Sequence, residues 1–164
     1  MSNVVGGLGK GWAVAMTTLG AERAGKAATQ YVGYRHELDV LAARLDKDGR
    51  LGDVIVRQRL AELVVEVELM RAVGSVIGAR VAEGETVDKL LAIDKVNWSE
   101  YHCVFGSTAL ELLGASALTR PDGDGYQLDS LQRVFLESRG TPDRTRVESD
   151  SAQHHRRTDS GFAR

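Results

Sequence analysis

Proline is absent from the first 120 residues of this chain, and its two prolines are Pro121 and Pro142. Because proline breaks helices and is common in turns, its absence over so long a stretch favours long, uninterrupted helices. Strand-like alternation of apolar and polar residues is missing after the first few residues. The sequence therefore predicts an all-α protein.

Apolar residues recur at intervals of three and four along four segments, which is the pattern of one face of a helix. The expected helices span about residues 11–45, 53–82, 86–113 and 128–138, and polar or glycine-rich turns separate them. Their apolar positions are Trp12, Met16, Leu19, Tyr31, Tyr34, Leu38, Leu41 and Leu45; Leu60, Leu63, Val67, Met70, Gly74, Ile77 and Val81; Leu91, Trp98, Tyr101, Phe105, Thr108 and Leu112; and Leu131, Phe135 and Leu136. This arrangement predicts an up-down four-helix bundle over residues 11–139.

Three residues give local signals about the helices. Gly74 lies within an apolar stripe, which indicates close contact with another helix although glycine weakens helices. Thr86 is expected to be the N-cap of the third helix. Gly114 is expected to end that helix.

Composition and charge exclude several classes of protein. The chain is 43% hydrophobic and 27% charged, which is ordinary for a soluble globular domain. A net charge of −2 gives no basic field that would attract nucleic acid or anionic lipid. No apolar run is long enough to cross a membrane, and no signal-peptide pattern begins the chain. The sequence predicts a cytoplasmic protein with no nucleic-acid or membrane partner.

Four sequence features could indicate a functional site, but the residues around each favour a structural or surface role. Cys103 is the single cysteine, so an intramolecular disulfide and a Cys-rich zinc site are excluded. The glycine-rich stretch 7–11 fails the Walker A pattern because Gly11 stands where Ser or Thr is needed, so a flexible entry to the first helix is the better interpretation. His154–Arg157 has no second ligand cluster, so no metal site is expected. Glu22 next to Arg23 is, on its own, typical of a solvated surface.

Four stretches together resemble the C-terminal helical domain of the acyl-CoA dehydrogenases. Residues 9–25 (GKGWAVAMTTLGAERAG) resemble the passage from the family's β-domain into the first bundle helix. Residues 56–71, 94–114 and 132–139 resemble the later helices. The resemblance covers about residues 4–141 and points to the actinobacterial steroid- and lipid-degrading branch. It implies that residues 1–10 are the remnant of the β-domain exit and that residues 11–139 are the family's bundle.

The resemblance also implies a chemistry. Members of the family combine an N-terminal helical domain, a β-domain and this bundle. Their FAD accepts a hydride from the β-carbon of an acyl-CoA thioester while a carboxylate removes the α-proton, and the electrons pass to an electron-transfer flavoprotein. FAD is therefore the implied cofactor and acyl-CoA the implied substrate.

Three residues match positions with a role in the family. Glu22 matches the catalytic base of the isovaleryl-type and steroid-type branches, and Arg35 matches the arginine that reaches the FAD phosphates. Glu111 stands where a glutamine usually precedes a glycine motif, and that motif here reads Gly114-Ala-Ser-Ala117. A carboxylate near a pyrophosphate is electrostatically unfavourable. The alternative base position of the family has no counterpart in this chain.

Residues that resemble the first two domains of the family do not occur in this sequence, which leaves three interpretations. The first is a truncated acyl-CoA dehydrogenase that is inactive alone. The second is one subunit of a heteromeric acyl-CoA dehydrogenase whose other chain supplies the missing domains. The third is a non-catalytic helical interaction protein. The partner is accordingly expected to be a second copy or an acyl-CoA dehydrogenase subunit.

Residues 140–164 are predicted to be a disordered tail, because Val147 and Phe162 are their only large apolar residues. We interpret the tail as frameshifted. One choice of codons for residues 154–163, read one nucleotide out of frame, encodes Ile-Ile-Ala-Glu-Arg-Ile-Leu-Gly-Leu-Pro, which resembles the end of the family's final motif.

The frameshift interpretation predicts the nucleotide sequence of the gene. The codons of residues 142–163 should yield the family's final motif in the shifted frame. Sequencing the gene with its flanks measures this directly. Codons that give no such motif would show that the tail has another origin.

Overall fold

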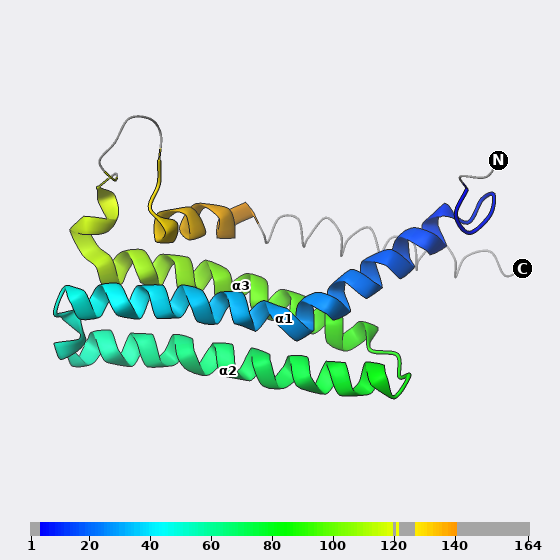
Figure 1. Cartoon of the computed structure of the whole chain (residues 1–164), viewed down its shortest axis with the longest axis horizontal. Coiled ribbons are helices and arrows are strands. Elements are labelled where there is room, and N and C mark those ends of the chain that lie inside the picture. Colours follow the sequence, from blue (N-terminus) through cyan, green and yellow to red (C-terminus); the bar gives the residue numbers. More distant parts are fainter. Residues whose placement is uncertain (1–3, 120, 122–126, 141–164) are drawn as a thin grey trace, which may run out of the picture.

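The computed structural model describes residues 4–119, 121 and 127–140. Three long helices lie side by side and a shorter helical segment packs along the third (Figure 1). The helices are α1 (Gly11–Lys47), α2 (Val54–Ala82), α3 (Asp88–Leu113) and residues 130–140, with short 3-10 turns η1 (Arg50–Gly52) and η2 (Gly114–Leu118). No strand occurs in these residues, so the expected all-α bundle is confirmed. The tail that we interpret as frameshifted lies outside the described residues from position 141 onward.

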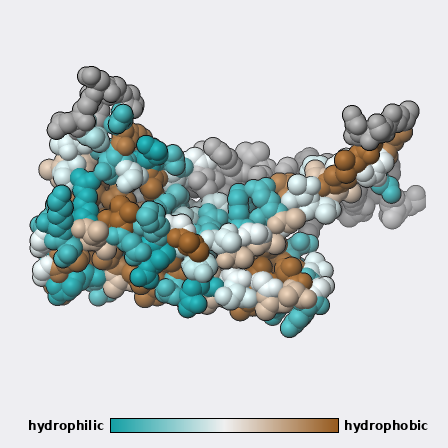
Figure 2. Space-filling model, viewed as in Figure 1, coloured by the Kyte–Doolittle hydropathy of each residue, from teal (hydrophilic) through white to brown (hydrophobic). Residues whose placement is uncertain are grey.

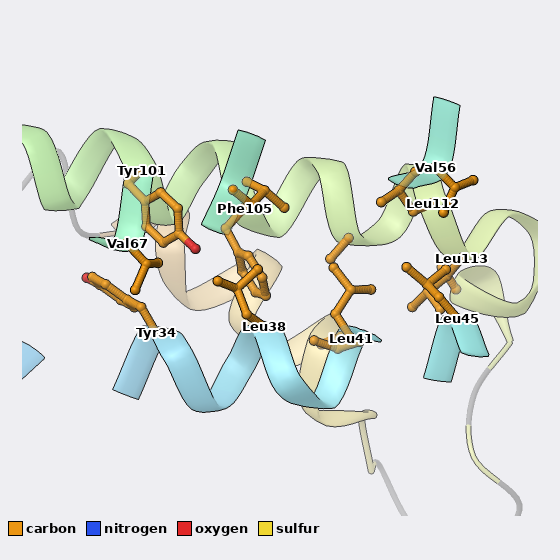
Figure 3. Packing of buried hydrophobic residues seen from close by; sticks show 14 of the residues in the cluster. Tyr34, Leu38, Leu41, Leu45, Val56, Val67, Tyr101, Phe105, Leu112 and Leu113 are labelled. Atoms are coloured by element: carbon orange, nitrogen blue, oxygen red, sulfur yellow. The ribbon is translucent and has the colours of Figure 1, made fainter. Parts of the chain in front are cut away.

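The main core fills the space between the three long helices. Figure 3 shows Tyr34, Leu38 and Leu41 of α1 pointing toward Tyr101 and Phe105 of α3. Phe105, Leu41 and Leu45 are fully buried, and Leu63, Val67 and Met70 of α2 close the cluster. These residues are the middle parts of the stripes expected from the sequence. Burial of such side chains contributes roughly 1.5–3 kcal/mol each, which makes this cluster the main stabilising feature of the bundle.

The N-terminal part of α1 does not share in this core. Ala27 is the first buried residue of α1, and Trp12, expected as part of an apolar face, is 51% exposed. The reason is length, since α1 has 37 residues and α3 has 26. This difference makes α1 roughly 16 Å longer at 1.5 Å per residue. The first turns of α1 therefore project beyond the bundle, and Figure 2 shows apolar residues at the surface of this end.

Two glycines set the closest approaches between helices. A Cβ at Gly74 of α2 would lie 2.2 Å from the carbonyl oxygen of Ala27 in α1. A Cβ at Gly106 of α3 would lie 2.9 Å from Cα of Phe135. No larger residue fits at either position without moving the neighbouring backbone. The close contact expected at Gly74 is thus confirmed.

Capping residues and a glycine determine where the helices begin and end. The side chain of Asp53 accepts a hydrogen bond of 2.8 Å from the amide of Ile55 and caps α2. Gly114 ends α3 with a φ of 61°, as expected. The prediction for Thr86 was wrong: the N-cap of α3 is Val87, which has no side-chain cap. Val87 is buried beside Leu91, and this apolar contact fixes the start of the helix one residue later.

Hydrogen bonds and an ion pair hold both ends of the short helix, residues 130–140, against the bundle. Asp129 accepts a hydrogen bond from the amide of Leu131 at 2.9 Å, and Gln132 accepts one from the amide of Asp129 at 3.0 Å, which is a capping box. Asp129 also pairs with Arg44 of α1 at 2.7 Å. At the other end, the thiol of half-buried Cys103 donates to the carbonyl of Ser138 at 3.2 Å. Cys103 is thus a packed residue, as expected.

Replacing Gly74 by alanine should destabilise the bundle. The new methyl group meets the backbone of Ala27, and overpacking of this kind costs about 1–3 kcal/mol, which alanine's gain of about 1 kcal/mol in helix propensity offsets only in part. Gly78→Ala is the matched control, because nothing lies within 4 Å of a Cβ there on the same helix. Denaturant unfolding should show Gly78→Ala at or above wild-type stability. Equal stability of the two variants would refute the close contact.

Candidate functional site

A groove of about 910 Å³ runs between α1 and α3. One wall is the face of α1 from Leu19 to Glu37, and the other is the face of α3 from Leu91 to His102. Glu137 of the shorter segment reaches the same space. Both walls carry charged side chains as well as apolar or aromatic ones, so the groove suits a ligand that is neither fully apolar nor fully polar.

Glu22 lies on the wall of this groove, near the projecting end of α1. Its carboxylate forms an ion pair of 2.7 Å with Lys26, one turn later in the same helix. Both side chains are 54% exposed. In this chain Glu22 is therefore a solvated, paired carboxylate, and any desolvation of it would have to come from groups that approach the groove from outside.

The inner end of the groove is more polar and more buried. Nε2 of His102 lies 3.3 Å from Oε1 and 3.2 Å from Oε2 of Glu37, so the imidazole sits against both oxygens of the carboxylate. Gln30 donates a hydrogen bond of 2.7 Å to the hydroxyl of Tyr34. Burial raises the pKa of Tyr34 above its ordinary value, so its hydroxyl stays protonated in the physiological range. The ring of Tyr34 also packs against that of Tyr101, 5.1 Å between centroids.

Asp94 is a buried carboxylate on the α3 wall, with 6% of its surface exposed. Burial raises the pKa of this carboxyl above its ordinary value, because the charged form is less well solvated there than in water. It lies one turn from Leu91 and one turn from Trp98, which also line the groove. Asp94 is therefore the acidic group of the groove that the fold perturbs most clearly.

Arg35 lies on another side of α1. Its guanidinium contacts Asp39 at 3.1 Å and Glu68 of α2 at 3.5 Å, and its side chain is 50% exposed. Arg35 does not line the groove, and it is 13 residues beyond Glu22, or roughly 20 Å along the helix. The structure thus separates the two residues.

Glu111 lies in a third place, near the end of α3. It is 64% exposed and pairs with Arg59 of α2 at 3.5 Å. Arg35 and Glu111 therefore both contact charged residues of α2, whereas Glu22 faces the groove between α1 and α3. The three residues expected from the resemblance do not form one cluster in this chain.

Several groove residues were missed by the sequence analysis, namely Asp94, His102, Glu37, Gln30 and Lys95. A signal existed for Asp94, because it follows Leu91 by three and precedes Trp98 by four, which places it within the buried stripe of α3. A carboxylate in an apolar stripe is the pattern that marks a perturbed acid. His102 and Glu37 are 65 residues apart and carry no local signal of their contact.

The described residues contain no group of three or more His, Cys, Asp or Glu side chains that could hold a metal ion. Among the described helices, none is both long and apolar enough to pass through a bilayer.

Residues 9–142 match the family model for the acyl-CoA dehydrogenase C-terminal domain. The chain belongs to the acyl-CoA dehydrogenase family. Among curated proteins it is 32% identical to acyl-CoA dehydrogenase IpdE1 of Mycobacterium tuberculosis over 140 residues, which cover 83% of this chain and 34% of that protein. It is 31% identical to the IpdE1 protein of Mycolicibacterium smegmatis over 137 residues, which cover 83% of this chain and 33% of that protein.

The chain thus spans about a third of the length of these acyl-CoA dehydrogenases. No solved structure matches it significantly. Members of the acyl-CoA dehydrogenase family are generally FAD-dependent and typically oligomeric.

The described residues fit a flavin pyrophosphate only in part. Arg35 has the right charge, and its ion pairs are half-exposed and worth roughly 1 kcal/mol or less, so they could be exchanged for a phosphate. Glu111 does not fit, because an ionised carboxylate accepts hydrogen bonds but donates none, and it repels phosphate. We therefore derive no step through the flavin from these residues.

Asp94→Asn should stabilise the protein at neutral pH. A raised native pKa means that the charged form is disfavoured by folding, so this cost is present above the native pKa and vanishes as the pH falls through it toward the ordinary carboxyl pKa of about 3.9. The variant's melting temperature should exceed that of the wild type at pH 7.5, and the gap should narrow toward pH 4. Glu100→Gln, at an exposed position two turns later in α3, is the control and should change little. A difference in melting temperature that stays constant with pH would contradict a raised pKa for Asp94.

Proposed function

We propose that this chain is the C-terminal domain of an acyl-CoA dehydrogenase and that Glu22 is the base that removes the α-proton of an acyl-CoA thioester. The position of Glu22 on the wall of the groove between α1 and α3 carries the proposal. Membership of the family supports the reaction, and the match of Glu22 to a family base position supports the residue.

The chemistry of Glu22 suits this role. A carboxylate in water is a weak base, but loss of solvent raises its pKa toward the working pH. In this chain one side of Glu22 is open and Lys26 pairs with the carboxylate at 2.7 Å. Closure of the groove by a thioester and by other domains would supply the desolvation. The described residues thus provide an oriented acceptor for a proton, while the environment that activates it comes from outside this domain.

We also propose that the 164-residue chain works only in an assembly that supplies the rest of the enzyme, as one subunit of a heteromeric acyl-CoA dehydrogenase. Glu111 favours a second candidate, a non-catalytic helical domain, because its carboxylate stands where an amide would serve a phosphate better. The two candidates differ in one outcome, which is whether activity depends on Glu22.

Glu22→Gln should abolish proton removal without disturbing the bundle. In an assembly of this chain with a complete acyl-CoA dehydrogenase subunit, the variant should lower the rate of acyl-CoA dehydrogenation by about 10²–10⁴-fold, since it removes a general base. Acyl-CoA binding should change by only a few fold, because the amide keeps the shape of the side chain. Deuterium uptake at the α-carbon in heavy water should fall in parallel.

Glu100→Gln is the control for that experiment, since Glu100 is exposed on α3 and does not line the groove. Full activity in both variants would exclude Glu22 as the base and leave the non-catalytic candidate. Loss of activity in both would indicate a general effect of removing charge.

A further inference from the structure

The carboxylate of Asp94 is buried on the wall of the groove without a partner of its own. Asp94 is 6% exposed and lines the groove from the α3 side. Within the part of the chain that the structure describes, no hydrogen bond or ion pair reaches this carboxylate, and burial is the cause of its raised pKa. Because an unpaired buried charge is costly, such a group in a cleft is a candidate for contact with a ligand.

Gln30 of α1 stands across the groove from Asp94. The hydroxyl of Tyr34 on α1 lies 3.5 Å from the carbonyl oxygen of Trp98 on α3, which is 64 positions later in the chain. Because α1 and α3 run in the same direction (Figure 1), the same separation of 64 brings Gln30 level with Asp94. Burial chiefly raises the pKa of Tyr34, and the charge of Asp94 adds to this effect, which places Asp94 near that hydroxyl.

The side-chain oxygen of Gln30 is a second buried acceptor that lacks a donor. The side-chain nitrogen of Gln30 donates to the hydroxyl of Tyr34 at 2.7 Å, and its Oε1 has no partner among the described residues. Two acceptors without donors therefore lie at the same level of the groove. A ligand that brings an O–H group to this level satisfies one of them, and the charged Asp94 is the stronger acceptor.

The charges around Asp94 select a neutral group. Glu37 lines the same groove, so an anionic group beside Asp94 would meet repulsion from both carboxylates. Lys26 and Lys95 line the two walls and oppose a cationic group. An apolar group would leave the buried carboxylate without a donor. A hydroxyl group avoids all three penalties.

We propose that Asp94 determines specificity in the groove by accepting a hydrogen bond from a neutral hydroxyl on the acyl group of a bound thioester. This inference rests on the proposed function, because it takes the groove to be the acyl-CoA site. Glu22 and Gln30 are eight residues apart on α1, or roughly 12 Å along the helix. The hydroxyl should therefore lie roughly 12 Å from the carbon that Glu22 deprotonates.

Thioesters that differ in one terminal group test the proposal. An extended chain advances about 1.2 Å per bond, so the hydroxyl of ω-hydroxydodecanoyl-CoA lies near the required distance. Titration calorimetry of the 164-residue chain should show this thioester binding about tenfold or more tightly than dodecanoyl-CoA, as expected for a hydrogen bond to a charged group. The thioester with a terminal carboxylate in place of the hydroxyl should bind more weakly than either, because like charges repel.

Asp94→Leu should remove the preference for the hydroxyl and leave binding of dodecanoyl-CoA equal or tighter. The variant should remain helical by circular dichroism, because leucine suits a buried position. Glu100→Leu is the matched control, since Glu100 is exposed on α3 and does not line the groove, and it should keep the preference. Glu22→Gln should keep it too, because removing the base leaves the hydroxyl contact in place.

Equal affinity of the wild-type chain for the hydroxylated and plain thioesters would overturn the proposal. A preference that persists in Asp94→Leu, or one that Glu100→Leu also loses, would overturn it as well. Failure of every thioester to bind would overturn both this proposal and the groove as the acyl site. If Glu22→Gln kept both the preference and full activity in the assembly, the base would be refuted while the hydroxyl contact of Asp94 stood.

Discussion

The contact of Gly74 with the backbone of Ala27 sets how closely α2 approaches α1, and the core between the helices is built next to that approach. Ala27 is the first buried residue of α1, so this contact is also where the helix enters the bundle. Beyond it, the apolar face of α1 packs on the core. A second face of α1, which runs from Leu19 to Glu37, borders the groove beside α3. A side chain at position 74 would push α1 and α2 apart at the place where α1 enters the bundle.

The candidate site residues lie on two sides of the domain, one at the groove between α1 and α3 and the other beside α2. The groove side carries Glu22 and the buried Asp94, whose carboxyl pKa is raised by burial. The α2 side carries Arg35 and Glu111, whose charges are balanced by Glu68 and Arg59. On the groove side the resemblance places a candidate base, Glu22, and on the α2 side it places the carboxylate of Glu111 where the family usually has a glutamine. This asymmetry is why we assign proton removal to the chain and no flavin step.

Much of the fold could be predicted because helical stripes are a local property of the sequence. The central residues of the stripes form the core, and Gly74 and Gly114 act as expected, since close contact and helix termination depend on the glycine itself. The exposure of Trp12 was not predicted, although the expected helices 11–45 and 86–113 already differ in length, because the sequence does not show which end of the first helix projects beyond its neighbours. The contact of His102 with Glu37 could not be predicted either, since it joins residues on different helices. The roles of Glu22, Arg35 and Glu111 came from resemblance and remain predictions.

The central claim is that this domain contributes a base to acyl-CoA dehydrogenation but does not hold the flavin by itself. The most direct measurement is the visible absorption spectrum of the purified 164-residue chain after incubation with excess FAD and gel filtration. The account predicts no flavin band above background, because a carboxylate at position 111 would repel the pyrophosphate. A flavin band at near one FAD per chain would contradict it.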